Sequence, residues 1–211
     1  MHRSSLMISL QRQIFANRTL TPAVTSRVTR PPCDVFINHR GPDTKRTVVT
    51  LLYDYLSQLN LRPFLDKKNM KPGDKLFEKI DAAVLGCKVG VAVFSPRYCQ
   101  SYFCLHELAL MVESQKKVIP IFCDVKPSEL RAVDVNGSCN AADLRRFDSA
   151  LEEAKHTVGL AFDSARGNWS DVVTSAADIV IKSLIEVEDE QQQRMQQNTR
   201  ENILRLPFHH R

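Results

Sequence analysis

The stretch Cys87-Lys-Val-Gly-Val-Ala-Val-Phe94 is almost continuously apolar. A strand with one face in water alternates polar and apolar residues, whereas a continuous apolar run is typical of a strand covered on both faces. The stretch therefore predicts an inner strand of a sheet that has helices on both sides.

Strand and helix patterns alternate on both sides of this stretch. The expected strands are 34–38, 61–65, 87–94 and 118–122, and the helices between them are 45–59, 76–84 and 104–114. Residues 66–74 read as a charged loop with a Pro-Gly turn, and Pro120 is awkward in a fully paired strand. This alternation predicts an α/β fold with a doubly wound parallel sheet and right-handed connections.

Length and charge set the domain organisation. The chain has 211 residues and 43% hydrophobic content, enough for one domain with tails, and no apolar run is long enough to predict a membrane-spanning helix. Residues 1–31 carry five arginines and no acid, which suits a disordered arm or a targeting segment. The rest is balanced in charge, which argues against a nucleic-acid surface.

The C-terminal part continues this organisation. Helices are expected at 141–156 and 172–184, with Trp169 packing near the start of the second. The domain is expected to span 32–186, and the polar tail 187–211 is either frayed helix or disorder.

The six cysteines are scattered, with no CxxC pair. Free cysteine packs as a small hydrophobe, so buried reduced thiols in an intracellular protein are expected, without a metal site. The cysteines are Cys33, Cys87, Cys99, Cys104, Cys123 and Cys139.

A single carboxylate, Glu107, lies in the largely apolar stretch Ser101–Leu110. Helical phase puts it on the same side as Phe103, away from the core-facing leucines. In the flavodoxin-like strand order, ligands bind between the loops after the first and third strands, which begin at His39 and Ser95. Glu107 is thus either a solvated helix residue or part of a ligand site, and the residues alone leave both open.

Four familiar catalytic and nucleotide-binding motifs are absent from the sequence. His106-Glu107 begins like H-E-x-x-H, but Leu110 stands where the second zinc ligand belongs, so His106 is expected to be structural. There is no G-x-S-x-G elbow, P-loop or G-x-G-x-x-G, so a nucleotide would be held by side chains and loops.

The segment Asp34-Val-Phe-Ile-Asn-His-Arg-Gly-Pro-Asp-Thr44 resembles the first strand and loop of plant Toll/interleukin-1 receptor (TIR) domains. Further blocks agree in order and spacing: Phe64-Leu-Asp66 with Gly73, Phe103–Leu108, and Val118–Ser128. The chain resembles the TIR-only proteins that also occur in grasses, and the resemblance implies a flavodoxin-like sheet of about five strands.

The resemblance also implies an activity. Plant TIR domains, when self-associated, cleave the nicotinamide–ribose bond of NAD⁺, giving nicotinamide and ADP-ribose or cyclic ADP-ribose isomers for immune and cell-death signalling. Glu107 aligns with the catalytic glutamate, and NAD⁺ is a substrate, so no cofactor is implied. The implied substrate-binding residues are His39, Arg40, Gly41, Lys71, Gly73, Ser101 and Phe103, the last at the usual tryptophan position.

Several expectations about partners and place depend on the same resemblance. It implies TIR–TIR association, downstream immune receptors for the products, and a cytoplasmic location, with nucleus and organelle left open. The loop around Lys67, Lys68, Lys71 and Lys75 is either solvated, in contact with phosphate, or an interface. A non-catalytic TIR adaptor is the alternative function, and nucleic-acid chemistry is a third.

This chain departs from the family pattern at several positions. Asn38, His39 and Pro42 replace the usual serine, phenylalanine and acidic residue, and Thr50-Leu51 aligns with a Ser-His pair used for association. These differences leave the mode of self-association open, while the presence of Glu107 is consistent with catalysis.

Overall fold

The computed structural model describes residues 33–204, except 135, 136 and 138. The arm 1–31 and residues 205–211 lie outside the described residues. A parallel sheet is the centre of the domain, with strand order β2-β1-β3-β4-β5, the flavodoxin-like order. The strands are β1 (Val35–His39), β2 (Pro63–Phe64), β3 (Val89–Phe94), β4 (Lys117–Cys123) and β5 (Leu160–Phe162).

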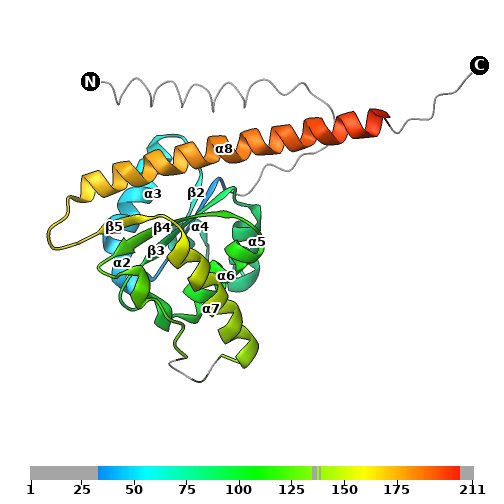
Figure 1. The fold of residues 1–211 in the computed structure, drawn as a ribbon. Coiled ribbons are helices and arrows are strands. Elements are labelled where there is room, and N and C mark those ends of the chain that lie inside the picture. The colour runs from blue at the N-terminus through cyan, green and yellow to red at the C-terminus, as the bar shows by residue number, and fades with distance from the viewer. Residues whose placement is uncertain (1–32, 135–136, 138, 205–211) are drawn as a thin grey trace, which may run out of the picture.

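Helices cover both faces of this sheet (Figure 1). One face packs against α3 (Thr50–Gln58) and the first half of α8 (Trp169–Leu204). The other packs against α5 (Leu76–Gly86), α6 (Tyr102–Glu113) and α7 (Ala141–His156). Shorter pieces are α2 (Gly41–Thr44), a π-helical turn at Lys45–Val49, α4 (Asp66–Asn69), and 3₁₀ turns at Tyr98–Gln100 and Pro127–Glu129.

All residues of β3 are buried, as its apolar sequence predicts. A Cβ at Gly90 would lie 2.3 Å from Sδ of Met111 on α6, so a larger residue there would force the Met111 side chain to move. This close approach packs the C-terminal part of α6 against the amino end of β3.

Four expectations need correction. The helix expected at 45–59 begins earlier, as α2, and bends at Thr47, whose backbone is not helical (φ −128°, ψ −125°). The loop expected at 66–74 contains the short helix α4. The strand β5 was missed because three residues are too few for a readable pattern. Pro120 fits because β5 pairs only with Ile121–Cys123, so β4 has a single neighbour at Pro120.

The last helix differs most from expectation. Instead of ending near Leu184, α8 continues to Leu204 and extends past the body of the domain (Figure 1). Its sequence has no glycine or proline and is rich in glutamate and glutamine, which favour a helix even without a core to pack on. Trp169 begins α8 and packs on Phe162 with ring centroids 4.6 Å apart, as expected.

Shortening α8 tests how much of it stabilises the domain. Its buried residues end at Leu184, and residues 189–199 are exposed. A chain ending after Glu190 is expected to keep its free energy of unfolding within about 1 kcal/mol, because surface changes away from the core cost little. Ending the chain after Ser175 removes the buried stretch and is expected to prevent folding. Urea denaturation followed by circular dichroism measures both.

Candidate active site

A buried chain of hydrogen bonds connects the end of β1 to α6. Asn38, fully buried on β1, donates from Nδ2 to Oε2 of Glu107 at 2.7 Å and to the carbonyl oxygen of Cys104 at 3.0 Å. Oδ1 of Asn38 accepts from the hydroxyl of Tyr98, which also lies 3.1 Å from the Cys104 carbonyl. The carboxyl group of Glu107 therefore has a defined position at the carboxyl edge of the sheet.

The first turn of α6 is attached to this edge at two further points. The hydroxyl of Ser101 caps the helix by accepting from the backbone N–H of Cys104 at 3.4 Å. The thiol of Cys104 lies 3.3 Å from the carbonyl oxygen of His39, to which it donates. Ser101 thus has a structural role in addition to the substrate contact that the sequence predicts for it. His39 is itself buried, and its backbone positions α6.

Burial raises the pKa of Glu107 to about 8 from its ordinary value of 4.5. The residue as a whole keeps some exposure, but protein surrounds its carboxyl group. The hydrogen bond from Asn38 lowers this pKa, whereas the charges of Asp66 and Asp81 raise it. A cation bound here would stabilise the ionised form, because opposite charge favours the carboxylate. The site is thus suited to a positively charged ligand.

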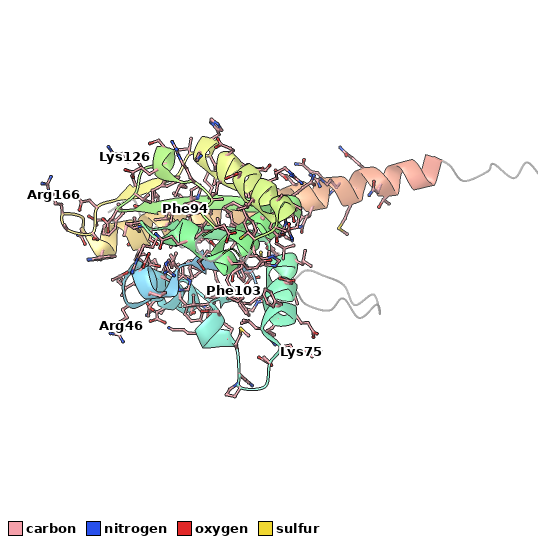
Figure 2. The ribbon with its side chains drawn as sticks, turned by 90° about the horizontal axis from the view of Figure 1, so that it is seen from below. Arg46, Lys75, Phe94, Phe103, Lys126 and Arg166 are labelled. Carbon is pink, nitrogen blue, oxygen red and sulfur yellow. The ribbon has the colours of Figure 1, made fainter. Side chains whose placement is uncertain are left out.

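Two exposed aromatic rings lie beside this site. Phe103 on α6 and Phe77 on α5 stack with centroids 5.3 Å apart and planes 26° from parallel, and 42% and 45% of their surfaces are exposed. Figure 2 shows Phe103 among the side chains of the domain. Exposed stacked rings offer an apolar face to a planar ligand. Phe77 was missed in the sequence because the pattern of α5 marks only its buried residues.

Arg40 lies in the loop after β1, half-buried, with Nε 3.7 Å from Oδ2 of Asp43. That nitrogen is buried and makes no hydrogen bond to any described residue. Asp43 also accepts from the hydroxyl of Ser95 at 2.8 Å and from Arg97 at 2.6 Å, so the loops after β1 and β3 meet, as the strand order predicts. Gly41 has open space where a Cβ would point.

Lys71 and Gly73 belong to the loop between α4 and α5, which projects from the body of the domain near Lys75 (Figure 2). Gly73 has φ of +97°, a conformation that glycine adopts at little cost. Among the described residues, no hydrogen bond or ion pair joins Lys71 or Gly73 to Glu107. Lys68 is occupied by Asp54 and the ring of Tyr53, and Lys75 by Glu78.

His106 is structural, as the sequence predicts. Its Nε2 lies 3.0 Å from Oδ1 of Asp81 on α5, and Nδ1 lies 3.2 Å from a guanidinium nitrogen of Arg146 on α7. Since arginine only donates, Nδ1 accepts and Nε2 carries the proton. The ring therefore links three helices, and within the described residues no group of three His, Cys, Asp or Glu could hold a metal.

The thiols agree with their expected role. In the described part of the chain all six cysteines are free, five are buried, and Cys139 is half-buried. Burial raises the pKa of Cys104 to about 12, so it is a neutral thiol. No helix among the described residues is long and apolar enough to cross a membrane.

A groove of about 810 Å³ lies away from Glu107, between α8 and the amino ends of β3 and β4. Its lining is mostly charged and polar, and it includes neither Glu107 nor Asn38, Phe103 or Arg40. A cavity of about 130 Å³ lies beside Asp43 and Ser95. Glu107 is an enclosed, hydrogen-bonded carboxylate with a raised pKa, which is typical of functional sites. The candidate site is therefore the one around Glu107 and not the larger groove.

Comparison with known proteins agrees with this fold. The TIR domain family profile matches residues 35–157, more than half of the chain. The chain is 54% identical over 158 residues to "Probable 2' cyclic ADP-D-ribose synthase BdTIR" of Brachypodium distachyon, covering 74% of this chain and 70% of that protein. The sheet order defines a flavodoxin-like α/β protein with a carboxylate at the carboxyl edge of its sheet. Within that class, the chain belongs to the TIR domain family.

Two further relatives are plant resistance proteins. The chain is 34% identical over 113 residues to TMV resistance protein N of Nicotiana glutinosa, covering 52% of this chain and 10% of that protein. It is also similar to the TIR domains in the structure of the activated Roq1 resistosome, with a TM-score of 0.62 and 26% identity, covering 70% of this chain and 99% of the other.

Proposed function

We propose that this protein cleaves the nicotinamide–ribose bond of NAD⁺ and releases nicotinamide with ADP-ribose or a cyclic ADP-ribose isomer. The observation that carries the proposal is the carboxyl group of Glu107, enclosed by protein and held by Asn38 beside two exposed rings. The similarity to a cyclic ADP-ribose synthase over most of both chains supports it.

A single carboxylate is sufficient for this reaction. Ordinary glycoside hydrolysis uses two carboxyl groups, because the departing oxygen must be protonated. Nicotinamide instead leaves as a neutral pyridine when the C–N bond breaks and its electron pair goes to the ring nitrogen. The positive charge then moves to the ribose as an oxocarbenium ion, which Glu107 stabilises electrostatically.

The nucleophile determines the product. If water attacks the oxocarbenium carbon and loses a proton, ADP-ribose forms. If a hydroxyl or adenine nitrogen of the same molecule attacks, a cyclic isomer forms, favoured by proximity. Arg40 is suited to the pyrophosphate because its guanidinium matches phosphate oxygens. The negative surroundings of Glu107 suit the cationic nicotinamide ring, and together these features separate the two ends of the substrate.

We also propose that the active form is a self-associated one. The similarity to TIR domains of a resistosome supports this, as does the exposed α4–α5 loop that carries Lys71 and Gly73. Leu51, where the family's Ser-His pair aligns, is 47% exposed on α3 and offers an apolar contact. Association of this kind makes turnover per molecule rise with protein concentration.

The experiment is mass analysis of products after purified full-length chain is incubated with NAD⁺ at several protein concentrations. We expect nicotinamide with ADP-ribose or a cyclic isomer, and a rate per molecule that rises with concentration. Glu107→Ala is the control and should leave NAD⁺ intact. Intact NAD⁺ with the wild type at high concentration would favour the adaptor function instead. Full turnover by the variant would show that the reaction does not depend on Glu107.

The exposed rings lead to a separate prediction. Phe103→Ala is expected to raise KM for NAD⁺ about 10-fold, because a stacking contact is worth about 0.5–1.5 kcal/mol beyond its area. Phe103→Trp should keep KM near the wild-type value. Leu85→Ala, which removes another exposed apolar side chain on α5, is the matched control and should leave KM unchanged. Steady-state kinetics of nicotinamide release measures all three variants.

A further inference from the structure

Asn38 is buried, and its side-chain amide makes hydrogen bonds to three groups. Both Nδ2 contacts are to acceptors, the carboxylate of Glu107 and the carbonyl of Cys104, while Oδ1 faces the Tyr98 hydroxyl. Turning the amide over would put Oδ1 against those two acceptors, which is unfavourable when Glu107 is ionised. The contacts therefore determine one orientation of the amide.

Tyr98 makes this orientation permanent. It is fully buried at the 3₁₀ turn after β3, and its ring packs edge-on against Phe94 at 4.7 Å between centroids. Burial raises the pKa of its hydroxyl well above the ordinary value, so the hydroxyl stays protonated and able to donate. A buried donor without an acceptor is costly, and Asn38 Oδ1 and the Cys104 carbonyl are the acceptors in reach.

We propose that Asn38 and Tyr98 are positioning residues that hold Glu107 in its reactive orientation and favour its ionised form. Tyr98 orients the amide of Asn38, and the amide holds Oε2 of Glu107. The same amide binds the carbonyl of Cys104, one turn before Glu107, so the carboxylate and the backbone of α6 are located by one group. A serine at position 38 would be too short to reach both.

The charged groups around Glu107 make this role necessary. Asp66 at the start of α4 and Asp81 on α5 both disfavour the carboxylate, and so does burial. Asn38 is the hydrogen-bonding partner that opposes them. Hydrogen bonds to a charged group stabilise it more than those to a neutral one, so losing the donor should raise the pKa of Glu107 further.

The kinetic test rests on the proposed NAD⁺ cleavage. Asn38→Leu removes the donor at similar volume, and Tyr98→Phe leaves Asn38 in place but frees its amide. We expect Asn38→Leu to lower kcat at least about 10-fold with KM little changed, and to move the acid limb of the pH–rate profile to higher pH. Tyr98→Phe should move the limb in the same direction by less. Ser95→Ala, which loses a hydrogen bond to Asp43 and none to Glu107, should leave the limb in place.

A second measurement needs neither enzymatic activity nor an Asn38 variant, so it can be made even if Asn38→Leu folds poorly. Thermal unfolding of the full chain is followed against pH for Tyr98→Phe, with Glu107 intact and in the Glu107→Gln background. We expect Tyr98→Phe to extend to higher pH the range over which stability falls, only where Glu107 is intact. The positioning role is overturned if Tyr98→Phe changes the pH dependence of stability equally in both backgrounds. It is also overturned if the acid limb of the pH–rate profile does not move. A protein that shows the expected unfolding but no NAD⁺ cleavage refutes the proposed function instead.

Discussion

Glu107→Gln is expected to lower the rate of nicotinamide release at least about 100-fold while making the folded protein more stable than the wild type above a pH of about 8. The two effects have one cause. The carboxylate is enclosed by protein, so its charge is available to stabilise an oxocarbenium ion and is also costly to keep in the absence of substrate. Glutamine keeps an oxygen that accepts from Asn38 but carries no charge.

The sign of the pH dependence follows from the raised pKa. In the unfolded chain Glu107 ionises near 4.5, and in the folded protein only near 8. Between these values the folded state binds more protons than the unfolded state, so the free energy of unfolding falls as pH rises through this window. Below 4.5 both states are protonated, and above about 8 the loss is complete. Glu107→Gln removes this contribution.

The measurement is the difference in melting temperature between Glu107→Gln and wild type across this pH range, together with the rate of nicotinamide release. We expect the difference to grow with pH and level off above about 8, and the rate to fall at least about 100-fold. Glu190→Gln, on the exposed part of α8, is the control and should change neither quantity. A melting-temperature difference that stays constant with pH would contradict the raised pKa.

The sequence predicts the frame of this site well, because the frame depends on local patterns. The apolar run of β3 predicts a sheet covered on both faces, and the strand order then brings the loops after β1 and β3 together. Helical phase places Phe103 and Glu107 on one side of α6. The structure confirms each of these predictions, because the apolar positions of the patterns are the positions that the fold buries.

The contacts within the site could not be predicted in the same way. Asn38 and Glu107 are 69 residues apart, and no periodicity records which polar side chain meets which across a sheet edge. Asn38 stood out as a departure from the family's serine, but its partner depends on where the first turns of α6 lie at the carboxyl edge of the sheet. The continuation of α8 was ambiguous for a related reason, since a polar helix without a core carries no pattern of burial.

Arg62→Leu is expected to lower the free energy of unfolding by about 3–5 kcal/mol, because it removes the counter-ion of a buried carboxylate. Asp34 is 1% exposed just before β1, and it accepts from Arg62 at three atoms: the backbone N–H at 3.0 Å, Nε at 3.1 Å and Nη2 at 2.8 Å. The backbone carbonyl of Asp34 also accepts from the N–H of Lys88 at 3.1 Å, which leads into β3. This pair therefore fixes the start of β1, the strand that carries Asn38 near its other end.

Urea denaturation of matched variants distinguishes the cost of removing one partner of the ion pair from the cost of removing both. Asp34→Val combined with Arg62→Leu should recover most of the stability, since replacing both members of this partly buried pair by apolar residues leaves no uncompensated charge. Lys75→Met breaks the exposed pair with Glu78 and should cost less than about 1 kcal/mol. If Arg62→Leu costs no more than Lys75→Met, Asp34 does not depend on its guanidinium partner. If it costs several times more, the position of β1, and so of Asn38, depends on an ion pair at the opposite end of the strand from Glu107.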